Sequence, residues 1–315
     1  MHITNNATSL VDALFSSNTN ATISNVKFVG DSKCIGIFAG GESAVPGLDP
    51  AFPDEGVVLG AGNIENLPFQ DSGYETTHFV TPGDQDLNNL LGQNSTADAC
   101  VLQVDFECNN GQAADVFFNC VFGSDEDSSY EDLISSLFYN DIFGLFLNGD
   151  NLAIVPNTTN TPVTTSTVNQ NQNSEYFIVN KGAQIASYPG IEMDGFTQKF
   201  TTVIGSATNG KNTLKIAIAD VGDSGTDSWV LLEAGSITCK VSPQSSESSE
   251  YHGNVDDKKI DVKKIDDDKK IDDKKIDDEK KIDDKKINDE IGRNPNPNTS
   301  TINRSKKSNK KTLRY

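Results

Sequence analysis

The sequence predicts an all-β protein: a single antiparallel β-sandwich or jelly-roll-like domain with a short N-terminal helix and a long disordered C-terminal tail. Short apolar or alternating runs, broken by Gly, Asn, Asp and Pro, begin near residue 22 and continue to Val241. Little helical periodicity lies between them, which is typical of a sandwich or jelly roll. The predicted strands are 23–29, 34–39, 56–60, 99–107, 115–122, 142–147, 151–155, 176–179, 198–204, 213–219, 228–233 and 236–241.

Residues 7–16 are predicted to form the short amphipathic helix, with Ser9 as its N-cap. Its apolar face holds Leu10, Val11, Leu14 and Phe15.

The strongest hairpin signal is the Asn109-Asn110-Gly111 turn between strands 99–107 and 115–122. Asn-Gly suits the positive φ angles of a tight hairpin turn, so these two strands are expected to pair.

The chain has five cysteines, at positions 34, 100, 108, 120 and 239. They are too few for a disulfide scaffold, and their odd number leaves at least one of them without a partner in the chain. Alternation along strand 99–107 and its flank places Cys100 and Cys108 on the apolar face. Burial as small hydrophobic side chains is therefore the default interpretation. The alternative is one disulfide, between Cys100 and Cys120, because these two lie nearly symmetrically about the turn at Asn110-Gly111.

Composition divides the chain into five segments. They are an N-terminal segment with the helix (1–20), the β-sandwich domain (21–242), a Ser-rich linker (243–254), a low-complexity Lys-Lys-Ile-Asp-Asp repeat (255–291) and a basic disordered tail (292–315). The repeat spaces its isoleucines alternately five and six residues apart, from Ile260 to Ile287. This spacing gives a helix no continuous apolar stripe, so the repeat is predicted to be a solvated tail and not a coiled coil.

Charge is unevenly distributed along the chain. Residues 1–254 hold seven lysines, no arginine and 31 acidic residues, a net charge of −24. This charge disfavours nucleic acid and anionic lipid as partners of the folded domain. Residues 293–315 hold seven Lys or Arg and no acid. Within this tail, Lys306–Arg314 is either a nuclear-localisation or polyanion-binding patch or simply a solubilising segment.

Location signals are few. No apolar run reaches transmembrane length. The first residues lack both a basic and an apolar stretch, so no signal peptide is expected. Sequons for N-glycosylation occur at Asn6, Asn20, Asn94, Asn157, Asn298 and Asn303.

An ordered set of segments, each weak alone, resembles the choice-of-anchor L domain family over residues 7–240. The segments include Gly36-Ile37-Phe38-Ala39-Gly40-Gly41, Gly83-Asp84-Gln85-Asp86-Leu87, Asp98-Ala99-Cys100, Asn140-Asp141-Ile142-Phe143-Gly144, and Lys215-Ile216-Ala217-Ile218-Ala219-Asp220 leading to Asp227-Ser228. The family is named for members that carry one domain on many different C-terminal sorting signals. The resemblance therefore implies an extracellular or cell-surface β-rich module for display or adhesion, whose ligand is unknown.

Acidic residues gather at predicted strand ends, most densely from Asp220 to Asp227. Ca²⁺ takes six to eight oxygen ligands, which carboxylates and loop carbonyls supply. We therefore expect a structural Ca²⁺ site, against the alternative that these side chains only cap turns through their own backbone. The candidate ligands are Glu126, Asn140, Asp141, Asp220, Asp223 and Asp227.

No catalytic residues are predicted. His78 is the one histidine within the predicted folded core, and no motif surrounds it. The rival enzyme hypothesis is a hydrolase of extracellular polymers that uses paired carboxylates among Asp125, Glu126 and Asp141. A third hypothesis is an intracellular scaffold directed by the basic tail, which the missing signal peptide favours.

Overall fold

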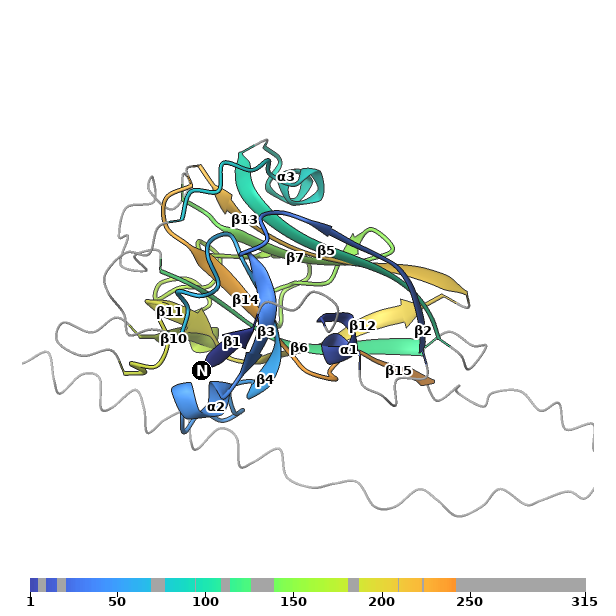
Figure 1. Ribbon diagram of the computed structural model, residues 1–315, viewed down its shortest axis with the longest axis horizontal. Coiled ribbons are helices and arrows are strands. Elements are labelled where there is room, and N and C mark those ends of the chain that lie inside the picture. Colours follow the sequence, from blue (N-terminus) through green and yellow to red (C-terminus); the bar gives the residue numbers. More distant parts are fainter. Residues whose placement is uncertain are drawn as a thin grey trace, which may run out of the picture. The chain divides into compact units, whose positions relative to one another are not determined.

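The computed structural model (Figure 1) describes residues 1–4, 10–15, 21–68, 77–93, 95–108, 114–125, 139–180, 187–208, 210–222 and 224–241. The chain divides into two units, residues 1–247 and 248–315, and every described residue belongs to the first. That unit consists mainly of two antiparallel sheets with few helices, so the predicted all-β sandwich class is confirmed.

The nine-stranded sheet is organised around one long strand, β6. One edge of β6 pairs with β14 and then β15, and its other edge pairs with β11 and then β12. The path through this sheet runs β1-β3-β4-β14-β6-β11-β10. The bounds are β1 (His2–Thr4), β3 (Ile35–Ala39), β4 (Glu55–Gly60), β6 (Ala114–Ser124), β10 (Phe177–Val179), β11 (Gly195–Thr197), β12 (Phe200–Ala207), β14 (Ser228–Glu233) and β15 (Thr238–Val241).

The six-stranded sheet follows the order β2-β5-β13-β7-β8, with β9 also paired to β7. Its central strands are long, and β13 pairs with β5 along nearly its whole length. The bounds are β2 (Ala21–Val29), β5 (Thr96–Cys108), β7 (Ile142–Leu147), β8 (Asp150–Asn151), β9 (Val163–Thr164) and β13 (Lys211–Val221).

The main core lies between the two sheets and is made by alternate residues of their strands. From β5 it receives the predicted apolar face, on which Leu102, Val104 and Phe106 are at most 1% exposed. From β6 it receives Phe118, Cys120 and Phe122. This alternation is what a strand with one face toward a core requires, and it confirms the periodicity seen in the sequence.

Part of the outer face of each sheet is also covered by apolar side chains. On the six-stranded sheet, α3 (Gln85–Leu91) buries Leu87 against residues such as Val101 and Ala217. On the nine-stranded sheet, Trp229 and Phe196 belong to a second apolar cluster that also includes Ala44 of α2 (Gly41–Ala44). Figure 1 shows these two helices on opposite sides of the domain. One short 3₁₀ turn, η2 (Ser174–Tyr176), completes the described elements.

The helix near the N-terminus is observed as α1 (Leu10–Leu14), and its predicted apolar residues Leu10, Val11, Leu14 and Phe15 are all buried. Ser9, the predicted N-cap, lies outside the described residues. The helix fills the break between β14 and β15, where Gly235 N donates to Ala13 O (2.8 Å) and Ile237 N to Leu14 O (3.3 Å). The last turn of the helix is therefore bonded to the turn between β14 and β15.

The predicted hairpin around Asn110-Gly111 is wrong. β5 pairs with β2 and β13 in the six-stranded sheet, whereas β6 belongs to the nine-stranded sheet. The connection therefore crosses from one layer of the sandwich to the other. Residues 109–113, which include the predicted turn, lie outside the described part of the chain.

The cysteine prediction also needs correction. Two disulfides are present, Cys34–Cys100 and Cys108–Cys239, while Cys120 is a buried free thiol. The prediction of a Cys100–Cys120 disulfide depended on the hairpin. Because β5 and β6 do not pair, this prediction is wrong as well. Both disulfides instead link β5 to the nine-stranded sheet. Cys34 directly precedes β3, and Cys239 belongs to β15.

Candidate functional site

The predicted acidic residues gather where β6 and β13 end and β7 and β14 begin, which we call the Asp141 end of the sandwich. Asp141 Oδ1 accepts a hydrogen bond from Val221 N (3.0 Å), and Asp141 Oδ2 accepts one from the Ser228 hydroxyl (2.6 Å). Ser228 Oγ also lies 2.8 Å from Ser124 Oγ. The start of β7 is thereby bonded to the residues that directly follow Asp220 and Asp227.

Asp227 holds a second loop in place. Its two carboxylate oxygens accept from Thr77 N (2.9 Å) and from the Thr77 hydroxyl (2.8 Å). Its backbone oxygen accepts from Asp125 N (3.1 Å). Gly62 packs directly on this carboxylate, because a Cβ at Gly62 would lie 1.9 Å from Asp227 Cγ. The Asp227 side chain is fully buried, so it acts inside the structure and not at its surface.

Two of the other predicted ligands, Asn140 and Asp220, lie within the described residues. Asn140 directs its side-chain oxygen to Ser166 N (3.0 Å), in a different loop. Asp220 is 1% exposed. Glu126 and Asp223 lie outside the described residues. Among the residues that the structure does describe, no group of three or more His, Cys, Asp or Glu is placed to hold a metal ion. The Ca²⁺ site accordingly stays a prediction.

Two of the three carboxylates of the hydrolase hypothesis, Asp125 and Asp141, are closed to solvent, and the third, Glu126, lies outside the described residues. Asp125 is 0% exposed and Asp141 is 1% exposed, and the Asp141 oxygens already accept two hydrogen bonds. A general acid or base must come within hydrogen-bond reach of its substrate. Buried in this way, Asp125 and Asp141 do not offer a substrate that reach. His78 is exposed on the neighbouring loop.

Sequence reasoning missed a further buried carboxylate at this end, Asp98. It accepts hydrogen bonds from Phe79 N (3.1 Å) and Thr81 N (2.6 Å), and it sits in a left-handed conformation with φ 47°. Between these two donors, Val80 is 88% exposed and also has a positive φ of 58°. A β-branched residue seldom adopts this conformation, so Asp98 fixes a strained loop that presents an apolar side chain to solvent. The sequence feature that could have indicated this residue is Asp98-Ala99-Cys100, in which an acidic residue directly precedes a predicted strand.

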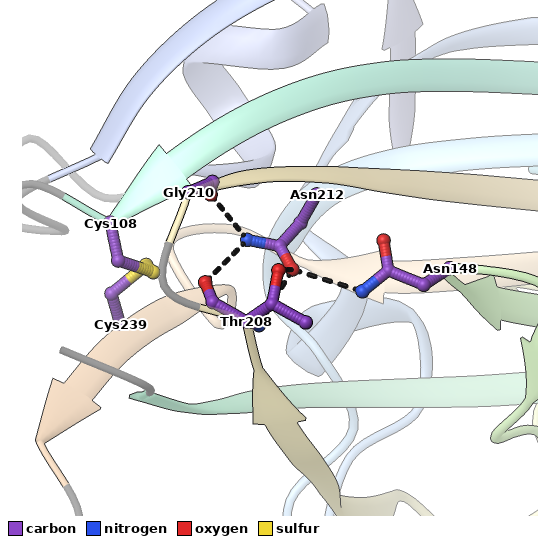
Figure 2. The surroundings of a disulfide bond; sticks show 6 residues. All are labelled: Cys108, Asn148, Thr208, Gly210, Asn212 and Cys239. Atoms are coloured by element: carbon purple, nitrogen blue, oxygen red, sulfur yellow. Dashed lines mark hydrogen bonds between the residues drawn. A yellow bond between two sulfur atoms is a disulfide. The ribbon is translucent and has the colours of Figure 1, made fainter.

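The opposite end, where β5 and β7 end and β13 begins, is the Cys108 end (Figure 2). Beside the Cys108–Cys239 disulfide, the buried Asn212 side chain accepts from Thr208 N (2.8 Å) and from Asn148 Nδ2 (2.9 Å). Its amide nitrogen donates to Thr208 O (3.1 Å) and Gly210 O (2.9 Å). Neutral amides therefore satisfy one another here without a carboxylate.

Near the Cys108 end, Asp105 joins three neighbouring strands of the six-stranded sheet. Its oxygens lie 2.7 Å from Lys211 Nζ on β13, 2.7 Å from Asn25 Nδ2 on β2, and 2.8 Å from Thr213 Oγ1. The ammonium of Lys211, followed by the donors of Asn25 and Thr213, lowers the pKa of Asp105 to about 2. The carboxylate is therefore ionised at every physiological pH.

Comparison with known proteins decides the family. A match to the choice-of-anchor L domain covers residues 2–238, about three quarters of the chain. The chain belongs to the choice-of-anchor L domain family. Searches among curated proteins and among solved structures gave no match. Membership indicates a surface-associated domain. Among the described residues of this choice-of-anchor L protein, no helix is long and apolar enough to cross a membrane.

Proposed function

We propose that this choice-of-anchor L domain is a non-catalytic module held outside the cell, where it displays its loops for adhesion to a surface or matrix ligand. The observation that carries the location is the pair of disulfides, which join four of the five cysteines across the sandwich. Disulfides of this structural kind persist in oxidising compartments and are rare in the cytosol. Family membership points the same way.

The display part of the proposal is supported by the loops at the Asp141 end. Buried carboxylates bind these loops to the sheets through hydrogen bonds. The loops therefore keep their shape although they lie outside the hydrophobic core. Val80 is the most exposed large hydrophobic side chain that the structure describes. A rigid loop with an exposed apolar tip binds at low entropic cost, because little freedom is lost on contact.

Thiol counting on native material tests the location. Protein denatured without reductant should react with one equivalent of alkylating reagent, at Cys120, and with five after reduction. A membrane-impermeant biotin reagent applied to intact cells should label the chain. Five reactive thiols before reduction, together with no surface labelling, would refute an extracellular module and favour the intracellular scaffold.

Attachment measurements test the adhesive role separately. Beads coated with the full chain should bind cells or matrix of the source organism more strongly than beads coated with the Val80→Asp variant. Val179→Asp, which changes another exposed valine on β10, is the matched control and should bind as the unchanged protein does. Equal attachment of all three proteins would contradict adhesion through the Asp141 end.

A further inference from the structure

A pocket of about 420 Å³ lies beside α1, away from the Asp141 end. It is bounded by the helix, by β3 and β4, and by the turn between β14 and β15. This volume is within the range of about 300–1,000 Å³ that small-ligand sites occupy. Its lining residues are Asp12, Ala13, Phe15, Ile37, Glu55, Gly56, Ala234 and Gly235.

The walls of this pocket are tied together by the backbone. Gly235 N donates to Ala13 O (2.8 Å), and Ala234 N donates to Glu55 O (2.8 Å). Phe15 forms a bridge with Ile237 and is 4% exposed. The helix, β4 and the β14–β15 turn are thus linked to one another, so the pocket does not depend on loose side chains for its shape.

Chemically the pocket combines two charges with apolar walls. Asp12 and Glu55 are both exposed, and within the described residues no ion pair or side-chain hydrogen bond engages either carboxylate. The remaining lining consists of Ala, Gly, Phe and Ile. No described cation lines the pocket, so within the described residues the two negative charges have no cationic partner.

The lining selects among possible cations. A hard ion such as Ca²⁺ needs six to eight oxygens, and two carboxylates among apolar side chains do not supply them. An arginine side chain fits better, because its weakly hydrated guanidinium tolerates apolar and aromatic neighbours while its fork of donors binds carboxylates. Its methylene stem would cover the apolar wall. The net charge of −24 over residues 1–254 also attracts a cationic partner.

We propose that the Asp12–Glu55 pocket is a docking site for an arginine side chain of a partner protein. The guanidinium lies between the two carboxylates, and the stem lies against Phe15 and Ile37. This proposal is independent of where the protein is located, because it rests on the pocket alone. Loss of extracellular location would leave it standing.

Ligand-observed NMR on the full chain tests the site with N-acetyl-arginine amide as the probe. Binding with a dissociation constant of about 1 mM is expected for a fragment of this size. N-acetyl-citrulline amide has nearly the same shape without the charge, and it should bind at least about tenfold more weakly. Asp12→Asn and Glu55→Gln should each weaken the arginine probe by about tenfold, since each removes one charge-assisted contact.

Matched variants separate this site from general attraction to an acidic protein. Asp150→Asn and Glu42→Gln each remove one exposed negative charge elsewhere, and both should leave binding unchanged. All four variants alter exposed side chains, and equal melting temperatures will show that the fold is kept. Equal losses in all four variants, equal binding of the citrulline probe, or equal binding of N-acetyl-lysine amide would each overturn the proposal.

Discussion

The two ends of the sandwich are closed by different chemistry. At the Asp141 end, buried carboxylates accept hydrogen bonds from backbone amides and hydroxyls, as Asp141 does from Val221 N and Ser228. At the Cys108 end, a disulfide and a network of hydrogen-bonded neutral amides around Asn212 hold the strand ends together. Hydrogen bonds from backbone amides and hydroxyls account for the positions of Asp141 and Asp227, so a density of acidic residues at strand ends does not by itself indicate a metal. Carboxylates are the buried acceptors around Asp141 and Asp227, whereas amide oxygens are the acceptors around Asn212.

Removing the Cys108–Cys239 disulfide should have the largest effect on stability. The two cysteines are 131 residues apart, so the bond restricts the unfolded chain strongly. In the chain-entropy account a loop of this size is worth about 5 kcal/mol. Urea denaturation of the Cys108→Ser/Cys239→Ser double variant should show a loss of that order. Cys120→Ala, which alters a thiol outside any disulfide, is the control and should lose about 1 kcal/mol.

The Asp141 end is tested by Asp141→Ala. This change leaves Val221 N and the Ser228 hydroxyl without their acceptor in a buried site. Hydrogen bonds to charged groups contribute about 1.5–3 kcal/mol each, so the unfolding free energy should fall by about 3 kcal/mol. Ser228→Ala removes only one of the two donors and should cost about 1 kcal/mol. Equal losses from both variants would show that Asp141 does not organise this end.

The sequence predicted the strands better than their partners, as two Asn-Gly pairs show. Asn148-Gly149 has the positive φ angles (54° and 97°) of a tight turn and joins β7 to β8, with Leu147 paired to Asp150. Asn110-Gly111 carries the same local signal, yet its flanking strands enter different sheets. Local chemistry specifies a turn, but strand pairing depends on contacts far along the chain. The disulfide partners could not be predicted for the same reason.

The candidate site shows a similar limit. The sequence indicated correctly that Asp141 and Asp227 lie at strand ends, because acidic residues there interrupt the apolar pattern. It could not identify their hydrogen-bond donors, since Thr77 is 150 residues from Asp227 and Ser228 is 87 residues from Asp141. Asp98 was missed because one acid beside a strand resembles an ordinary turn residue.

The proposed Ca²⁺ ion would add a second difference between the ends. A ligand that binds only the folded state stabilises it by about 2.7 kcal/mol at about a hundredfold excess over its dissociation constant. Thermal melts in Ca²⁺ and in EDTA should then differ by several degrees, and Asp220→Asn should remove the difference. Mg²⁺ should substitute poorly, because it demands compact octahedral geometry. Identical melts in Ca²⁺ and EDTA would leave the Asp141 end held by hydrogen bonds alone.

The smallest expected effect concerns Asp105, a carboxylate near the Cys108 end that has a lysine partner. Its pKa in the folded protein, about 2, is below the ordinary value of 3.8, chiefly because of Lys211. A lowered folded-state pKa gives stability that is fully present above about pH 4 and is lost as the pH falls toward 2. Because the Lys211 side chain is 55% exposed, this contribution should be modest and should weaken in salt.

Lys211→Gln tests this assignment. At pH 6 and low salt the variant should be slightly less stable than the unchanged protein, and the difference should shrink as the pH falls from about 4 to 2, where Asp105 becomes protonated. The pKa of the Asp105 carboxyl, followed by NMR, should rise in the variant because its first donor is gone. Lys27→Gln, which removes an exposed lysine from β2, should leave that pKa unchanged. If both variants shift the pKa of Asp105 equally, the net charge of the acidic domain and not the Lys211 contact sets it.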